Sequence, residues 1–171
     1  MGAWKRVMLA ALIMGGMAAC DDADDTSAQD TTNQSGPSGI STACLKELPE
    51  PSVDSQTPAR LNLTLSDFVY SFEEGRHRFT HDRRFKESAG IGLFIYRGKV
   101  CVEDGTSCAD ACVRYRIEPG GSLTQRDHHF ATPLDPDRIT LQYWARDDAG
   151  HVMTLKQEIQ TKGRAATVMP N

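Results

Sequence analysis

The segment from Glu73 to Glu87 (EEGRHRFTHDRRFKE) concentrates basic side chains. Arginine guanidinium groups bind phosphate and carboxylate oxygens in pairs, so such a cluster can hold an anionic sugar, a lipid headgroup or a phosphate. The candidate binding residues here are Arg76, Arg83 and Arg84. Acidic residues in the same segment favour a second interpretation, a solvated loop between strands whose charges compensate one another.

Histidines form a second group with ligand chemistry. His77 and His81 are four residues apart, and His128 and His129 are adjacent. Their imidazole nitrogens can bind a metal ion if the two segments meet. On a strand, however, side chains four residues apart are well separated and adjacent ones point to opposite faces. The spacing favours surface histidines, with a metal site as the alternative.

Aspartates near two expected turns offer carboxylate oxygens for a calcium ion, namely Asp135, Asp137, Asp147 and Asp148. No calcium-loop motif accompanies them, so we interpret them as turn residues. The sequence also contains no GxSxG or HExxH motif and no glycine-rich phosphate loop before a helix. We therefore expect neither an enzyme nor a cofactor.

An export signal occupies the first twenty residues. Basic residues precede an uncharged apolar run at 7–19 (VMLAALIMGGMAA) that is too short to span a membrane. The run ends in MAAC at 17–20, which resembles the lipobox of bacterial lipoproteins. The resemblance implies that residues 1–19 are a signal peptide and that Cys20 receives a diacylglyceryl group and acyl chains such as palmitate. The mature protein would then be lipid-anchored to the cell membrane or the outer membrane, facing the periplasm.

The residues after Cys20 predict a tether. Residues 21–43 contain one large aliphatic side chain, Ile40, among Asp, Ser, Thr, Gln and Gly. Such a composition cannot bury enough apolar surface to offset the entropy of ordering the chain. We expect residues 20–43 to be a flexible acidic tether. Asp21 resembles the inner-membrane retention signal of enteric lipoproteins, but other bacteria sort by different rules, so the choice of membrane stays open.

The cysteines beyond Cys20 are expected to form disulfides, because an exported protein folds in an oxidising compartment. They are even in number, and three pairings are open. If 99–103 and 112–118 are neighbouring strands, Cys101 can face Cys112 and leave Cys44 for Cys108. The alternative is a zinc or redox site that uses Cys101, Cys108 and Cys112.

Length and composition leave room for one compact domain with appendages. The chain has 171 residues, of which 39% are hydrophobic and 25% are charged, values that fit a folded domain. Its 19 lysines and arginines are outnumbered by 23 aspartates and glutamates, for a net charge of −4. We expect no binding to nucleic acid.

Beyond Cys44 the hydrophobic pattern is typical of strands. Gly98 is expected to form a hairpin turn, and at most a short helix is expected around 80–88. In the last hairpin, alternation predicts that Tyr143 points inward and that Trp144 points outward as a candidate binding residue. The expected strands are 60–65, 67–72, 91–97, 99–103, 112–118, 139–146 and 153–159. They predict a β-sandwich at 44–160, followed by a disordered tail at 161–171.

The stretch from Arg138 to Ile159 resembles the closing hairpin of bacterial immunoglobulin-like domains. The resemblance rests on Tyr143, Ala145, Asp147, Ala149 and Gly150. It implies an all-β, antiparallel immunoglobulin-like sandwich with an adhesive or structural role. We predict a membrane-anchored, non-enzymatic binding or scaffolding module for an envelope protein or glycan. The alternative is a periplasmic metal-binding domain with His or Cys ligands.

Overall fold

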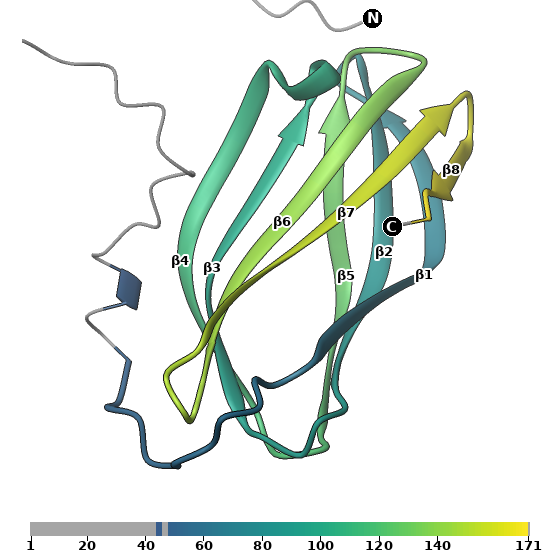
Figure 1. Ribbon diagram of the computed structural model, residues 1–171. Helices are drawn as coiled ribbons and strands as arrows, with labels where there is room; N and C mark the ends of the chain where they lie inside the picture. Colours follow the sequence, from purple (N-terminus) through teal and green to yellow (C-terminus); the bar gives the residue numbers. More distant parts are fainter. Residues whose placement is uncertain (1–43, 46–47, 171) are drawn as a thin grey trace, which may run out of the picture. The chain divides into compact units, whose positions relative to one another are not determined.

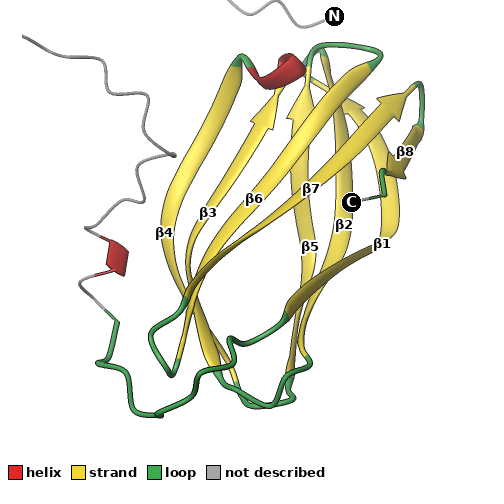
Figure 2. Ribbon diagram, in the orientation of Figure 1, coloured by secondary structure: helices red, strands yellow, loops and turns green. Residues whose placement is uncertain are grey.

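A computed structural model describes residues 44–45 and 48–170, and these form two antiparallel β-sheets (Figure 1). A short 3-10 helix, η1 (Glu103–Gly105), joins β3 to β4 (Figure 2). Among the residues that the structure describes, no helix is long and apolar enough to cross a membrane. The strands are β1 (Leu61–Glu73), β2 (Arg76–Glu87), β3 (Leu93–Val102), β4 (Ser107–Ile117), β5 (Ser122–Thr132), β6 (Asp137–Asp147), β7 (Val152–Lys162) and β8 (Ala165–Val168).

The predicted antiparallel, disulfide-stapled sandwich is confirmed. One sheet has the order β1-β2-β5 and the other has the order β4-β3-β6-β7-β8. Immunoglobulin-type sandwiches have strands A, B and E in one sheet and strands C, F and G in the other. The same division is seen here, with β1, β2 and β5 in one sheet and β3, β6 and β7 in the other. The predicted signal peptide (1–19), the lipidation of Cys20 and the tether (20–43) lie outside the described residues.

The structure corrects the expectation for 76–87, which is neither a loop nor a helix but strand β2. Its inward positions alternate regularly, with Phe79, His81, Phe85 and Glu87 buried. The alternation was hard to recognise in the sequence because two of these buried side chains are polar, and because Arg83, on the same face, is charged. Strand β5, which pairs with β2, was also not expected.

Three further expectations about strands were wrong. The segments 60–65 and 67–72 form one strand, β1, which is interrupted by an irregularity between Ser66 and Val69. Gly98 lies within β3 and not in a turn. A Cβ atom at this position of β3 would come 3.4 Å from the Tyr143 ring. Residues 161–168 of the expected disordered tail are ordered, because β7 continues to Lys162 and β8 pairs with it.

The main core lies between the two sheets. Phe79 of β2 stacks on Phe130 of β5 with ring centroids 5.5 Å apart. Phe85 meets the ring of Tyr143 edge-on at 4.9 Å, so Tyr143 points inward as predicted. Aromatic pairs of this kind add about 1 kcal/mol each to the area they bury. The packing sets the width of the space into which the polar side chains of β2 project.

The predicted exposure of Trp144 is wrong. Its side chain does point to the outer face of the five-stranded sheet, but it is only 3% exposed. Residues Cys44 and Leu48 of the entry segment cover it together with Tyr96. The guanidinium of Arg97 lies 4.3 Å from the centre of the Trp144 ring. Trp144 is therefore part of a second small core and offers no stacking surface to a ligand.

The predicted disulfide pairing is also wrong, although both disulfides form. The bonds join Cys44 to Cys112 and Cys101 to Cys108. In the register of β3 and β4, Cys101 stands directly opposite Cys108, because β4 already begins at Ser107. All four sulfurs are oxidised, which leaves no thiolate for the alternative zinc or redox site.

Candidate functional site

A partly open cavity of about 290 Å³ lies between the sheets. It is situated where β5 and β4 form the edges of their respective sheets, so no backbone pairing closes this side of the sandwich. The apolar lining comes from Val100, Ala109, Ala111, Val113 and Leu141, the aromatic lining from Tyr115 and Tyr143, and the polar lining from His81, Arg83, Lys99, Asp110, His128 and His129. Gly98 completes the wall, where its missing side chain leaves room for the Tyr143 ring.

His81 contributes a buried imidazole to this cavity. The residue is 3% exposed, and neither ring nitrogen makes a hydrogen bond of standard geometry with the described chain. Its ring stacks on Phe68 at 5.2 Å and lies 5.6 Å from the ring of Phe130. Burial lowers the pKa of His81 to about 4, and the backbone of Phe79 opposes this effect only in part. His81 is therefore neutral at pH 7, with one donor and one acceptor nitrogen.

Strand pairing brings His128 to the same cavity. It stands opposite His81 in the register of β2 and β5. The register then shifts, so that Gln125 rather than Arg126 stands opposite Arg83. Burial, and then the charge of Arg83, lower the pKa of His128 below its ordinary value. Regular alternation with Phe130 thus directs a second largely neutral imidazole at the inter-sheet space, and the irregularity in β5 brings Gln125 opposite Arg83.

Arg83 supplies the positive charge of the cavity. Its Nε donates a hydrogen bond to Gln125 Oε1 at 2.6 Å, and its Nη1 donates one to the Tyr143 hydroxyl at 2.8 Å. The guanidinium also lies 5.4 Å from the Tyr143 ring centre and 5.9 Å from that of Tyr115. Within the described residues no carboxylate forms an ion pair with Arg83, and Nη2 has no acceptor. The charge is held in place but is not neutralised.

The structure separates the three predicted binding arginines. Arg83 points inward, whereas Arg76 and Arg84 are exposed at alternate positions of β2 that belong to the outer face of the sheet. Arg84 donates a weak hydrogen bond to Ser122 Oγ at 3.3 Å. The hypothesis that the three arginines bind one anion together is therefore wrong, and only Arg83 reaches the cavity. Its aromatic partners Tyr115 and Tyr143 were not foreseen as site residues, although the two-residue period from Phe79 to Phe85 already places Arg83 on the inward face.

The histidines are only partly brought together. His81 and His128 meet, but the Nδ1 of His77 is 3.1 Å from the Tyr70 hydroxyl, and its ring lies 5.0 Å from that of Phe72. Among the described residues no group of three His, Cys, Asp or Glu side chains is arranged to hold a metal ion. The guanidinium of Arg83 beside the two imidazoles also repels a cation. The geometry therefore disfavours the alternative of a histidine metal site.

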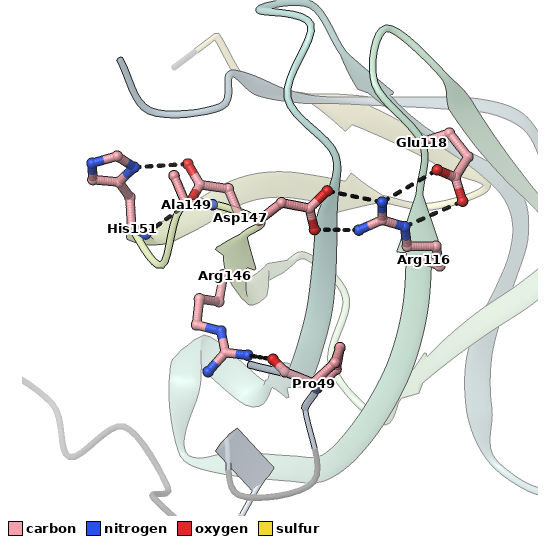
Figure 3. A network of polar contacts seen from close by, with 8 residues as sticks. Pro49, Arg116, Glu118, Arg146, Asp147, Ala149 and His151 are labelled. Atoms are coloured by element: carbon pink, nitrogen blue, oxygen red, sulfur yellow. Dashed lines mark hydrogen bonds and ion pairs between the residues drawn. The ribbon is translucent and has the colours of Figure 1, made fainter. Parts of the chain in front are cut away.

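The aspartates have structural roles in turns, which agrees with their interpretation from the sequence as turn residues. Asp137 and Asp147 stand at opposite ends of β6, so they cannot share one calcium ion. Asp147 accepts hydrogen bonds in the β6-β7 turn (Figure 3). Asp148 forms a two-point ion pair with Arg116. Asp135 accepts a hydrogen bond from the backbone of Gly163.

Comparisons with known proteins add nothing to the description of the site. No protein-family model matches the chain, and no curated protein matches it. A Bordetella pertussis structure described as an ApaA protein is 13% identical, covers 66% of this chain and 94% of its own, and has a TM-score of 0.46. A second structure, Northeast Structural Genomics Consortium target SoR45, is 7% identical, covers 62% and 87%, and has a TM-score of 0.48. Similarities this distant carry no inference about function.

His81 is expected to make the protein sensitive to mild acid. Between pH 6.5 and pH 4 the unfolded chain binds a proton at this residue that the folded protein does not bind. The free energy of unfolding should therefore fall across this window by at most about 3 kcal/mol. Urea unfolding followed by circular dichroism at several pH values measures the slope. His81→Phe should remove most of this pH dependence. His129→Phe, at the exposed position that follows His128, should retain it. A slope unchanged in His81→Phe would contradict this account.

Proposed function

We propose that the protein is an envelope lipoprotein whose sandwich binds a ligand without catalysing a reaction. Its anchor is the lipidated Cys20, and its location is the periplasmic side of the cell membrane or outer membrane. The ligand seat is the cavity between the sheets, and the partner is an envelope glycan or protein that presents a group small enough to enter it. The observation that supports this most directly is the buried, unpartnered imidazole of His81 beside the unneutralised guanidinium of Arg83.

Buried polar groups normally have hydrogen-bond partners, and a cavity that gathers such groups is the usual place for a ligand. Here the side chains of His81 and Arg83 belong to the lining of a space walled by aliphatic and aromatic side chains. The apolar walls can bury the body of a ligand, and the polar atoms can fix its orientation. This combination is typical of specific binding sites.

The side chains that line the same cavity do not favour catalysis. The lining described above contains no serine, threonine or cysteine that could act as a nucleophile. Its carboxylate, Asp110, is bound by Arg97 through several hydrogen bonds, which lowers the pKa of Asp110 and keeps it ionised. A carboxylate held in this way is a poor general acid. A binding role therefore accounts better for the arrangement.

Two variants should separate the anchor from the ligand seat. Cys20→Ser is expected to move the full chain from the membrane fraction to the soluble fraction while ligand binding is kept. Ala111→Phe fills the cavity, so it should leave the protein in the membrane fraction and weaken binding about tenfold or more. Thermal-shift titrations with peptidoglycan fragments, lipopolysaccharide, small organic acids and Zn²⁺ provide the measurement.

Thr124→Phe is the matched control for the cavity variant, because it adds the same ring at an exposed position of β5. It should bind as the unchanged protein does. If Ala111→Phe bound every probe as well as Thr124→Phe, the cavity would not be the ligand seat. If Cys20→Ser stayed in the membrane fraction, the anchor would lie elsewhere.

A further inference from the structure

The charges of the cavity are not balanced. Arg83 has no acidic partner among the described residues, and Lys99 adds a second cation to the lining. The carboxylate of Asp110 is engaged by Arg97, and that of Asp82 lies near the Arg126 side chain at 3.9 Å. A half-buried cation without a counter-ion is costly, and a bound anion relieves that cost.

We infer that the cavity binds a carboxylate that is attached to a compact apolar group. This inference rests on the proposed binding function and names the chemistry of its ligand. The planar guanidinium of Arg83 matches the two oxygens of a carboxylate, and both Nη2 hydrogens are free to be donated. The imidazole of His81 lies in the same lining. With Arg83 and Lys99 positive and Asp110 negative, the lining carries a net charge of +1 (2 − 1), which suits a monoanion better than a doubly charged phosphate.

The apolar half of the ligand would lie against Val100, Val113 and Leu141. A volume of about 290 Å³ corresponds to roughly ten water-sized groups, so the ligand has about ten non-hydrogen atoms inside the cavity. A free organic acid has this chemistry, and so does the carboxylate end of a larger envelope molecule that enters the open side. Both sources share the same recognition.

A matched series of probes tests the inference with the full chain. The probes are 3-phenylpropionate, 3-phenylpropanol and 3-phenylpropylammonium, which share one apolar body and differ in the charge of the head. Calorimetric titration is expected to show that the carboxylate binds about tenfold or more tightly than the alcohol, and that the ammonium compound does not bind. Acetate should bind more weakly than 3-phenylpropionate because it lacks the apolar body.

Arg83→Met should abolish the preference for the carboxylate over the alcohol, because it keeps the volume of the side chain and removes its charge. Arg84→Met, on the outer face, is the matched control and should retain the preference. Shifts of the His81 and His128 ring proton resonances on titration would place the carboxylate in the cavity. Competition by peptidoglycan fragments would identify a cell-wall source, and its absence would favour a free organic acid.

Equal affinity for the alcohol and the carboxylate, or binding of the ammonium compound, would overturn the inference. Tight binding of Zn²⁺ that is lost in His81→Phe would replace it with a metal site. In each of these cases the effect of Ala111→Phe still decides the proposed function, since that variant blocks the cavity whatever the ligand. Loss of the carboxylate preference in both methionine variants would also contradict the assignment to Arg83.

Discussion

Asp147→Ala is expected to lower the free energy of unfolding by about 3–5 kcal/mol. The Asp147 side chain is fully buried, and its two oxygens accept four hydrogen bonds. Oδ2 accepts from the backbone of Ala59 at 2.9 Å and from His151 Nδ1 at 3.0 Å. Oδ1 accepts from the backbones of Ala149 at 3.0 Å and His151 at 2.8 Å. Alanine would leave these donors without partners and would remove the hydrogen bond that joins Ala59 to the β6-β7 turn.

The effect of Asp147→Ala should depend on pH. Burial alone would raise the pKa of Asp147, but the hydrogen bonds from Ala59 and His151 lower it below its ordinary value. The stabilisation is therefore complete above the unfolded pKa of about 4 and is lost as the pH falls through the folded value. Glu87 and Asp137 are held by backbone donors in the same way and contribute in the same direction.

Chemical unfolding at pH 7 measures the loss, and Asp135→Ala is the control. Asp135 is exposed and accepts a hydrogen bond from Gly163 at 2.7 Å, so its removal should cost less than about 1 kcal/mol. Equal stability of the two variants would contradict the role assigned to Asp147. Repeating the comparison near pH 3 should bring the two variants closer together.

Removal of the Cys44–Cys112 disulfide is the second change with a large expected effect. The bond spans 68 residues, so the chain-entropy model assigns it about 4 kcal/mol. The Cys101–Cys108 bond spans 7 residues and is assigned about 2 kcal/mol by the same model. The double serine variant at Cys44 and Cys112 should therefore be less stable than the double serine variant at Cys101 and Cys108.

The two disulfide variants should also differ in the fluorescence of Trp144. In a Trp4→Phe background Trp144 is the one remaining tryptophan of the chain. Without Cys44–Cys112 the entry segment is no longer tied over Trp144, so the emission should shift to longer wavelength as water reaches the ring. Without Cys101–Cys108 the emission should not change. Intact masses before and after reduction confirm that each variant retains one bond, and a shift in both variants would contradict the specific role of Cys44.

The sequence predicted best where inward positions are uniformly apolar. In β6, Ile139, Leu141 and Tyr143 alternate with polar residues, and the turn between β6 and β7 was located to within about one residue, although β7 runs beyond Ile159 to Lys162. In β2 the inward positions include His81, Arg83 and Glu87, so the local pattern resembled a charged loop. Glu87 is acceptable there because Ala89, Gly90 and Gly120 donate backbone hydrogen bonds to it. Two of these donors belong to its own turn, but Gly120 is distant in the sequence.

The remaining features depend on contacts between residues far apart in the chain. Alternation correctly gave the direction in which Trp144 points, but its burial is due to Cys44 and Leu48, about a hundred residues earlier. The number of cysteines predicted two disulfides, whereas the register of β3 and β4 selected the pairs. Side-chain direction follows from local backbone geometry, which a short segment contains within itself. Burial, register and the cavity around Arg83 arise from the packing of separate strands, which no short segment encodes.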